Sequence, residues 1–408
     1  MKLLTVDTLE QAREKLCEKV KHLPLKTEFV PLEKAHNRIL AENIFAPNDI
    51  PGFRRATVDG YAVLAADTTG AGESIPVFLK HAGAVHMGKS ADFSIRAGDC
   101  ADVPTGGMLP DGADAVVMLE FCESAGKNIA VCEAVAPGAG VAEIGEDMQS
   151  GELLLTKGRR IRPQEIGLMA AAGITNINVF SPLRLTLIST GDELIPVEQN
   201  PAPGKIRDIN THALKALALK RGYSIVSAQL IPDNKEHLEK AIKEALVFSD
   251  VVAISGGSSQ GEKDHTASVI NQIAKPGVFT HGLALKPGKP TILGWDEESL
   301  TLFAGLPGHP VSAMVVFELI LGWLYDKHFN LAPPLPVPAT ISSNLPGAPG
   351  RTVCQPVILT LEGFTYYAEP VFGKSGMITT LSNANGYIII DLNKEGLKKG
   401  EPVLVHLF

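Results

Sequence analysis

The sequence predicts a multidomain α/β plus β protein: a doubly wound α/β domain, a β-rich inserted domain, a mixed N-terminal segment and a C-terminal β domain. Three observations predict this fold class. The chain of 408 residues is too long for one ordinary core and fits about two to four domains. Short β-prone runs bounded by Gly, Pro and Asp fill residues 27–147. Strand and helix patterns then alternate over residues 184–328.

The composition limits the classes of function that fit the chain. Hydrophobic residues make up 45% and charged residues 20%, which is the balance of a soluble globular protein. The net charge of −8 disfavours general binding to nucleic acid or to an anionic membrane surface, so we expect neither as a partner. The most apolar long segment, residues 311–325, carries Glu318 and is too short for a membrane span.

Cysteine usage and the N-terminus indicate the compartment. The five cysteines are an odd number without a C-x-x-C pair, which favours neither a disulfide framework nor a structural zinc site. Asp7 and Glu10 interrupt the stretch in which a secretory signal needs apolar residues. We therefore expect a cytoplasmic protein.

The first elements are two helices with β-prone sequence between them. An opening helix is expected from about Thr8 to Lys21, with Asp7 placed as its cap. Its apolar stripe is Leu9, Ala12, Leu16 and Val20. A second helix should begin at Pro163, which suits a first turn, and end at Gly173. The predicted domains are a mixed domain of residues 1–45 and 143–183, a β-rich inserted domain of residues 46–142, an α/β domain of residues 184–328 and a C-terminal β domain of residues 329–408.

One stretch of the predicted insertion matches a nucleotide-binding pattern. Residues 83–90 read GAVHMGKS, which fits G-x-x-x-x-G-K-[ST], a loop that requires a strand before it and a helix after it. The segment after Ser90 alternates apolar and polar residues as far as Gly98, which predicts a second strand. We interpret the match as a chance occurrence in a β-hairpin connection.

The α/β domain is predicted from apolar strands that are each followed by a helix. Such an alternation implies parallel pairing and right-handed crossovers. Asn210 is placed to cap the first of these helices and Gly222 to end it. After this domain, a proline-rich linker from Ala332 to Ala339 leads to further strands. The expected strands are residues 184–190, 223–231, 250–255 and 300–306, and the expected helices are residues 210–222, 234–248, 264–275 and 310–325.

Residues suited to anion and metal binding follow the strands of this domain. In an open parallel sheet, ligands bind outside the carboxyl ends of the strands. Carboxylates follow three strands, and a glycine-rich segment can present backbone N–H groups to an anion. Two lysines add positive charge, and a helix begins near Pro310. Carboxylates beside anion donors predict a bridging Mg²⁺. The residues are Glu193, Asp233 and Asp264, then Gly256, Gly257 and Ser258, and finally Lys286 and Lys289.

A plainer interpretation of the same residues stays open at this point. Asp233 and Asp264 each stand where they could cap a helix, and glycine-rich turns commonly close connections between strands and helices. The glycine spacing at residues 256–261 does not match a dinucleotide fingerprint, which excludes a Rossmann dehydrogenase.

Eight motifs resemble the molybdopterin molybdenumtransferases, the MoeA family, which includes the E domain of gephyrin. They follow the order of that family along nearly the whole chain. The motifs are VDGYAV (58–63), PTGGMLPDGADAVV (104–117), GED (145–147), STGDEL (189–194), SGGSSQGEKD (255–264), LKPGKP (285–290), GLPGHPVSA (305–313) and SGMITTLSNANGY (375–387).

The resemblance implies a fold and a reaction. The α/β domain would resemble molybdopterin adenylyltransferase. The protein would insert molybdenum from molybdate into adenylated molybdopterin and release AMP, with dependence on Mg²⁺. It would act as a homodimer in which Asp59 and Thr105 of one subunit serve the site of the other, and contact with molybdopterin adenylyltransferase is a further expectation.

The resemblance also implies the site residues, carried over position by position. The positions that match the family's catalytic acidic and hydroxyl residues are Asp59, Thr105, Asp147, Glu193, Asp233 and Asp264, of which Glu193, Asp233 and Asp264 would hold the metal. The positions that match its substrate-binding residues are Gly256, Gly257, Ser258, Lys286, Lys289, Pro307, Gly308, Pro310, Arg351 and Ser375.

Four departures from the family pattern affect the substrate site. His309 replaces the usual Asn of the PGNP loop, and His265 stands where Tyr is common. Ala142 stands where an arginine is expected. The fourth departure is RRATVDG in place of NSAMDG. A basic contact is therefore missing at Ala142 or is supplied by Arg54 or Arg55 of that segment.

Two other functions remain open alongside molybdenum transfer. Tungstate and molybdate are nearly identical oxyanions, so a tungsten-inserting paralogue fits the same residues. A catalytically weakened scaffold is the other, because the same domain set serves receptor anchoring in gephyrin.

Overall fold

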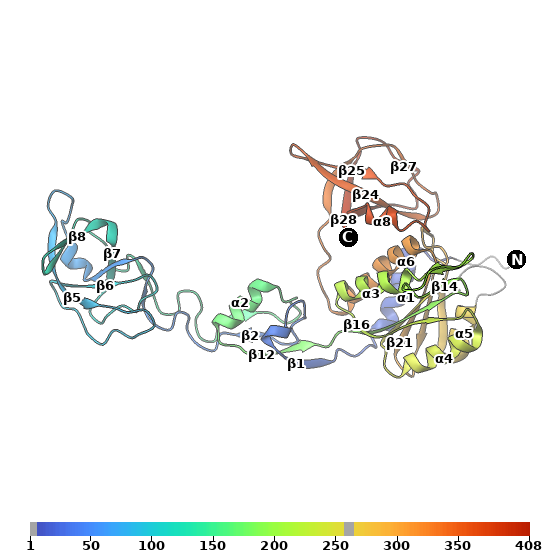
Figure 1. The fold of residues 1–408 in the computed structure, drawn as a ribbon, viewed down its shortest axis with the longest axis horizontal. Helices are drawn as coiled ribbons and strands as arrows, with labels where there is room; N and C mark the ends of the chain where they lie inside the picture. The colour runs from blue at the N-terminus through green and yellow to red at the C-terminus, as the bar shows by residue number, and fades with distance from the viewer. Residues whose placement is uncertain (1–5, 257–264) are drawn as a thin grey trace. The chain divides into compact units, whose positions relative to one another are not determined.

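The computed structural model describes residues 6–256 and 265–408, which form two compact units (Figure 1). Unit 1 comprises Met1–Glu28, Asn37–Ile39 and Val179–Phe408, and unit 2 comprises Phe29–His36 and Leu40–Asn178. The chain therefore leaves unit 1 near its N-terminus, builds unit 2 and returns.

A six-stranded sheet is the centre of unit 1. Its order is β16-β13-β17-β21-β20-β18, and the first four strands are parallel. The doubly wound domain is confirmed, but the sheet is mixed, because β20 and β18 extend it as antiparallel strands that the sequence did not predict. The strands are β13 (Arg184–Thr190), β16 (Ser224–Ile231), β17 (Val251–Ser255), β18 (Pro276–His281), β20 (Ile292–Asp296) and β21 (Thr301–Leu306).

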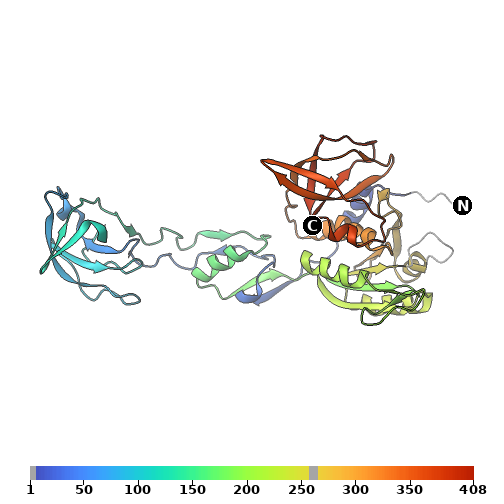
Figure 2. The same ribbon diagram turned by 45° about the horizontal axis from the view of Figure 1, so that its top comes forward.

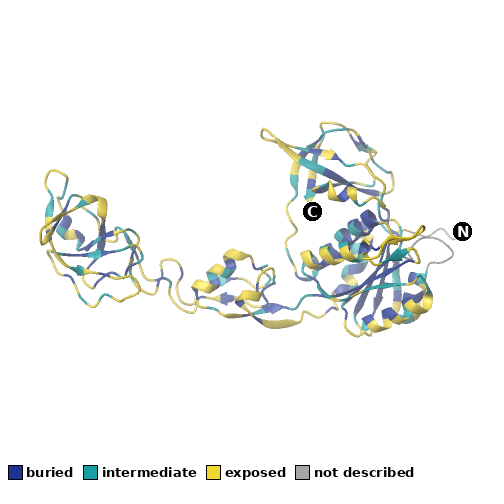
Figure 3. Cartoon of the chain, in the orientation of Figure 1, coloured by how far each residue is buried: buried dark blue, intermediate teal, exposed yellow. Residues whose placement is uncertain are grey.

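Helices cover both faces of this sheet. In Figure 1, α4 and α5 lie together on one face, and α3 and α6 lie on the other. Figure 3 shows that the strands are largely buried, whereas the outer faces of the helices are exposed. The helices of unit 1 are α1 (Leu9–Val20), α3 (Asn210–Arg221), α4 (Lys235–Leu246), α5 (His265–Ile273), α6 (Pro310–Val316), the π-helical η4 (Phe317–Gly322), α7 (Trp323–His328) and α8 (Thr379–Ser382).

The opening helix α1 buries the predicted stripe, but its cap differs from the prediction. Thr8 is the N-cap and forms a capping box with Gln11. Asp7 instead accepts hydrogen bonds from Lys15 and from the Thr280 hydroxyl. The helix packs against α7, where the guanidinium of Arg13 lies 5.0 Å from the centre of the Trp323 ring.

The single helix predicted over residues 310–325 contains a change of helical type. The chain stays helical from Pro310 to His328 but passes through the π-helical η4 between α6 and α7. Gly222 ends α3 as predicted, with a left-handed φ of 107°.

The C-terminal part of unit 1 is a small closed barrel (Figure 2). Its strands run in the order β24-β25-β22-β28-β26, and β26 pairs back with β24 to close the ring. Closure leaves the barrel without a free sheet edge in this ring, and apolar side chains such as Val357 and Ile388 fill its interior. The strands are β22 (Val337–Ile341), β24 (Thr352–Glu362), β25 (Thr365–Pro370), β26 (Gly386–Ile390) and β28 (Pro402–Leu407), with the short pair β23 (Leu345–Pro346) and β27 (Gly396–Leu397).

Unit 2 contains a six-stranded sheet of its own and one α-helix. The sheet order is β7-β4-β6-β5-β9-β8, and apolar clusters pack on both of its faces. The helix α2 (Pro163–Ala171) begins at Pro163 as predicted. The strands of the sheet are β4 (Gly60–Val63), β5 (Val77–Ala84), β6 (Asp99–Val103), β7 (Ala115–Met118), β8 (Cys122–Ala125) and β9 (Asn128–Val131).

The predicted hairpin around GAVHMGKS is wrong. Strands β5 and β6 pair in parallel, and the segment from Ala91 to Gly98 is irregular. Residues 85–90 form a turn in which the Lys89 N–H donates to the His86 carbonyl oxygen at 3.2 Å. The chain then runs to β6 without the helix that a phosphate-binding loop requires, so this part of the prediction is confirmed.

Short elements complete the chain. No helix among the described residues is long and apolar enough to cross a membrane, and all five cysteines are free. The remaining strands are β1 (Thr27–Pro31), β2 (Ile44–Phe45), β3 (Arg55–Ala56), β10 (Val141–Ala142), β11 (Leu153–Leu155), β12 (Asn176–Phe180), β14 (Leu194–Ile195), β15 (Ile206–Arg207) and β19 (Leu285–Lys286), and the 3₁₀-helices are η1 (Leu32–Lys34), η2 (Ala65–Thr68) and η3 (Leu119–Phe121).

Candidate functional site

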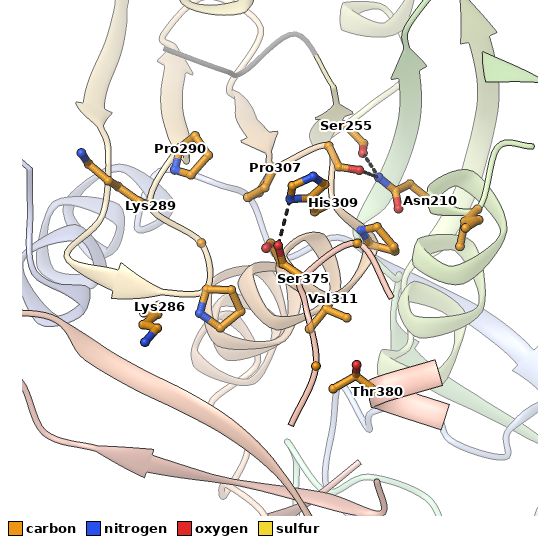
Figure 4. Close-up of a pocket in the computed structure, with 18 of the residues that line it drawn as sticks. Asn210, Ser255, Lys286, Lys289, Pro290, Pro307, His309, Val311, Ser375 and Thr380 are labelled. Carbon is orange, nitrogen blue, oxygen red and sulfur yellow. Dashed lines mark hydrogen bonds between the residues drawn. The ribbon is translucent and has the colours of Figure 1, made fainter. Parts of the chain in front are cut away.

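A cavity of about 1110 Å³ lies in unit 1 at the carboxyl ends of β13, β17 and β21, where the barrel also contributes to the wall (Figure 4). This is the edge at which an open parallel sheet binds ligands. Ten of the residues predicted for the site line it: Glu193, Asp233, Gly256, Lys286, Lys289, Pro307, Gly308, Pro310, Arg351 and Ser375.

The other predicted residues lie elsewhere. Gly257, Ser258 and Asp264 fall outside the described residues. Asp59, Thr105 and Asp147 belong to unit 2.

The acidic part of the cavity is built by the ends of two neighbouring strands. Thr190, the last residue of β13, donates its hydroxyl to Asp233 Oδ1 at 3.2 Å. The backbone N–H of Asp233 donates to Asp192 Oδ1 at 3.1 Å. Asp233 does not cap α4, because Asn234 is the N-cap and accepts the His237 N–H. The interpretation of Asp233 as a plain helix cap is therefore wrong, and its carboxylate lines the cavity.

The basic part of the cavity comes from one loop and from the barrel. Lys286 is the last residue of β19, which pairs with β24 of the barrel, and Lys289 lies on the loop that follows (Figure 4). Arg351 precedes β24. Cations that line one cavity raise the local concentration of anionic ligands, so the cavity is suited to phosphate or another oxyanion.

The loop from Pro307 to Pro310 is held from two directions. The amide of Asn210 donates to Ser255 Oγ at 2.6 Å and to the Gly308 carbonyl oxygen at 2.8 Å. From the other side, Ser375 Oγ lies 2.9 Å from His309 Nδ1. The prediction that Asn210 caps α3 is wrong: the helix begins at Asn210, and both amide hydrogens are used to fix the cavity wall.

Sequence reasoning missed several residues that line the cavity. Thr190 and Ser255 are the last residues of the buried strands β13 and β17, and a polar residue at the carboxyl end of such a strand is the signal that could have identified them. Asp208 is 4% exposed and borders the same cavity just before α3. His309, which departs from the family pattern and is absent from the predicted site residues, also lines the cavity.

In unit 2, the structure joins two of the three predicted residues. The backbone N–H and the hydroxyl of Thr105 donate to Asp59 Oδ1 at 2.6 and 2.9 Å. These hydrogen bonds lower the pKa of Asp59, the backbone N–H first, and keep it ionised. Asp147 lies on a turn where its N–H donates to the Ile50 carbonyl oxygen at 3.0 Å.

Ala142, which stands where the family pattern has an arginine, lies next to another arginine. Ala142 on β10 is the direct cross-strand partner of Arg55 on β3. Side chains at opposed antiparallel positions are close neighbours, so Arg55 lies beside the position in question.

The described residues fit a Mg²⁺ that is shared with a ligand. Within residues 6–256 and 265–408, no three His, Cys, Asp or Glu side chains come together to hold a metal alone. Glu193 and Asp233 nevertheless line the same cavity as the cations. Mg²⁺ commonly takes only one or two carboxylates and completes its shell with phosphate oxygens and water.

The fold and cavity together define a class of protein: a multidomain ligand-binding protein whose α/β domain places acidic and basic residues around one site. Known proteins narrow this class. The chain matches "MoeA N-terminal region (domain I and II)" over residues 7–173, "Probable molybdopterin binding domain" over residues 186–326 and "MoeA C-terminal region (domain IV)" over residues 338–408.

Individual relatives cover almost the full chain. A protein of Haemophilus influenzae named molybdopterin molybdenumtransferase is 32% identical, over 98% of each chain. One of the same name from Bacillus subtilis is 31% identical, over 94% of this chain and 90% of its own. The crystal structure of a molybdopterin biosynthesis MoeA protein from Pyrococcus horikosii has a TM-score of 0.80 at 37% identity, over 99% of both chains. The chain belongs to the MoeA family, and the resemblance recognised in its motifs is confirmed.

Proposed function

We propose that this protein is a molybdopterin molybdenumtransferase, acting at a late step of molybdenum cofactor biosynthesis. It would insert molybdenum from molybdate into adenylated molybdopterin and release AMP. One observation carries the proposal: ten residues implied by the family pattern, from segments spread over residues 193–375, line a single cavity. Relatives that bear this name match along nearly the whole length of the chain.

The basic and the polar residues of the cavity have different roles in the proposed reaction. Lys286, Lys289 and Arg351 bind the anionic groups, which are the phosphates of the adenylated substrate and the molybdate oxyanion. Asn210 fixes the end of β17 at Ser255 and the loop at Gly308, which holds this wall of the cavity in one geometry. Preorganised donors of this kind stabilise charge that develops during reaction without reorganising.

The proposal includes dependence on Mg²⁺. Glu193 and Asp233 would hold the ion on the cavity wall together with substrate phosphate, and Asp264 is proposed as a third carboxylate from the sequence alone. A bound Mg²⁺ would neutralise charge on the phosphoanhydride as it is cleaved. Asp233 is already oriented by the Thr190 hydroxyl, which leaves its second oxygen for the ion.

The proposal further includes a cytoplasmic homodimer. Asp59, Thr105 and Asp147 would complete the cavity of the other subunit, with Arg55 supplying the basic contact absent at Ala142. Contact with molybdopterin adenylyltransferase is included because the adenylated substrate must come from an enzyme that makes it.

The decisive experiment supplies the reactants directly. The purified chain is incubated with adenylated molybdopterin, Mg²⁺ and molybdate, and both AMP and the finished cofactor are measured. We expect both products, and we expect Asp233→Asn to lower turnover by about a hundredfold or more because a positioned charge is lost. Neither AMP nor cofactor from a folded wild-type protein would refute the proposed function. Parallel reactions with tungstate measure the preference between the two metals.

A further inference from the structure

Two side chains from distant parts of the chain meet in the cavity. His309, the residue before α6, and Ser375, in the loop after β25, are joined by the 2.9 Å contact between Nδ1 and Oγ (Figure 4). The same segments are joined by the Val311 N–H, which donates to the Ser375 carbonyl oxygen at 3.1 Å. His309 is exposed on the cavity side, and its Nε2 has no hydrogen-bond partner within residues 6–256 and 265–408.

The direction of this hydrogen bond depends on the tautomer and on the protonation of His309. In the neutral ring with its proton on Nε2, Nδ1 can only accept, so the Ser375 hydroxyl donates to it and has no proton left for a ligand. In the charged ring, Nδ1–H donates to Ser375 Oγ. The hydroxyl proton of Ser375 is then free to point into the cavity.

We propose that His309 and Ser375 form a proton-coupled anion-binding pair, in which protonation of His309 releases the Ser375 hydroxyl to donate to an oxyanion in the cavity. The charged pair offers the anion a hydroxyl proton, an Nε2–H and a positive charge together. The neutral pair with its ring proton on Nε2 offers the anion only that Nε2–H. This inference rests on the proposed function, since it takes the oxyanion to be a substrate of this cavity.

Among the described titratable side chains of the cavity, His309 is the one whose change of charge the experiment would detect. Between about pH 6.5 and 8.5, lysine, arginine and carboxylate side chains ordinarily keep one charge state, whereas histidine ordinarily changes its own at the lower end of this range. Burial raises the pKa of the Cys354 thiol, so that group stays neutral. Among the residues that the structure describes, the charged side chains that line the cavity with His309 are Lys286, Lys289, Arg207, Arg351, Glu193, Asp208 and Asp233.

The experiment measures binding rather than turnover. Sulfate, which keeps its charge across this range, and molybdate are titrated into the full chain by calorimetry at pH 6.5 and 8.5, in two buffers of different ionisation enthalpy. The positive charge and the freed hydroxyl of the protonated pair both favour an anion, so we expect the affinity to be about tenfold higher for the protonated form. We expect tighter binding at pH 6.5, accompanied by proton uptake.

Two variants separate the pair from a simple positive charge. His309→Asn keeps a neutral donor that cannot titrate, so the affinity should change by less than about twofold between the two pH values. Ser375→Ala should weaken binding by about three- to tenfold at pH 6.5, the scale of one hydrogen bond, but by less than about twofold at pH 8.5. Ser382→Ala, on α8 outside the cavity lining, is the matched control and should behave as wild type.

The possible failures are distinguishable. If the folded wild-type chain binds neither anion at either pH, the proposed function fails together with this inference. Equal binding at both pH values, without proton uptake, overturns this inference alone. This inference is also overturned if both variants lower the unfolding temperature but leave the pH dependence of anion binding intact. The pair is then only a structural link between the loop and the barrel.

Discussion

Glu165 shows at the scale of one residue how a buried carboxylate is kept charged. It is 2% exposed and lies in the first turn of α2. The Arg162 guanidinium donates to both of its oxygens, the Arg162 backbone N–H donates to Oε2, and Arg159 donates to Oε1. These contacts, with Arg162 first, hold the pKa of Glu165 at about 2.

The pH dependence of unit 2 follows from this shift. A carboxylate whose pKa is depressed in the folded state contributes stability above its unfolded pKa, near 4.5, and loses it as the pH falls towards 2. We expect Glu165→Gln to destabilise α2 by about 1.5–3 kcal/mol at pH 6, because hydrogen bonds to a charged group are lost. Amide exchange of the α2 backbone measures this difference. It should shrink between pH 4.5 and pH 2.5, and a difference that stays constant would contradict the assignment.

Helix caps show why single residues are hard to predict from sequence. At α1 and α4, two adjacent residues can both cap, namely Asp7 or Thr8 and Asp233 or Asn234. The structure decides each case through contacts distant in sequence: Asp7 is taken by Thr280 as well as by Lys15. A local pattern contains no information about such partners, so the type of cap was predictable and its position was not.

At the scale of elements, Gly256 joins β17 to the cavity. Its φ is +101°, and an added Cβ would overlap the carbonyl oxygen of Thr190 at the end of β13. Gly204 has a similar φ of +85°, but nothing lies within 4 Å of the position of its Cβ. Gly256→Ala therefore adds a backbone clash to the strain that both substitutions share.

The two glycine variants form a matched pair. Gly204→Ala should cost about 1–2 kcal/mol, the usual penalty for a left-handed residue with a side chain. Gly256→Ala should cost clearly more and should also weaken anion binding. Both tryptophans, Trp295 and Trp323, lie in unit 1, so their fluorescence during urea unfolding reports on this unit. Equal costs would show that β13 and β17 separate readily at this point.

Element prediction succeeded where periodicity and core packing agree. The parallel strands β13, β16, β17 and β21 and the helices between them lie close to their predicted ranges. The segment 92–98 alternates like a strand, yet only Ser94 pairs, in an isolated bridge to Asp111. Phe93 and Ile95 nevertheless pack into the core of unit 2. Alternation reports burial on one side, and burial does not require a neighbouring strand.

At the scale of the whole molecule, the site depends on segments that the sequence cannot bring together by local rules. The cavity joins the ends of β13 and β17, the loop after β19 and the loops around Arg351 and Ser375. The ends of β13 and β17 were predicted from strand order alone, because ligands bind outside the carboxyl ends of the strands of an open parallel sheet. The contributions of the barrel were predicted only from the family resemblance, because no periodicity encodes where a separate small barrel packs.

The proposed homodimer makes a prediction about subunits that carry different defects. Asp59→Ala alters unit 2 and Asp233→Asn alters unit 1, and each variant alone should be nearly inactive. If each site uses unit 2 of one subunit and unit 1 of the other, a mixed dimer has one site with both defects and one intact site. Such dimers, isolated by two different affinity tags after co-expression, should recover about half of wild-type turnover.

A third variant controls for nonspecific damage to unit 2. Lys89→Ala changes an exposed turn that belongs to no predicted site, so turnover should stay within a few fold of wild type. Doubly tagged dimers of Asp59→Ala and Asp233→Asn that form but remain inactive would exclude a site shared in this way. If each site were built from a single subunit, both sites of the mixed dimer would carry one defect, and no activity would return. Loss of activity in Lys89→Ala would instead place phosphate chemistry at GAVHMGKS. That result would contradict our interpretation of the motif, which is based on the turn observed there and on the absence of a helix between Ser90 and β6.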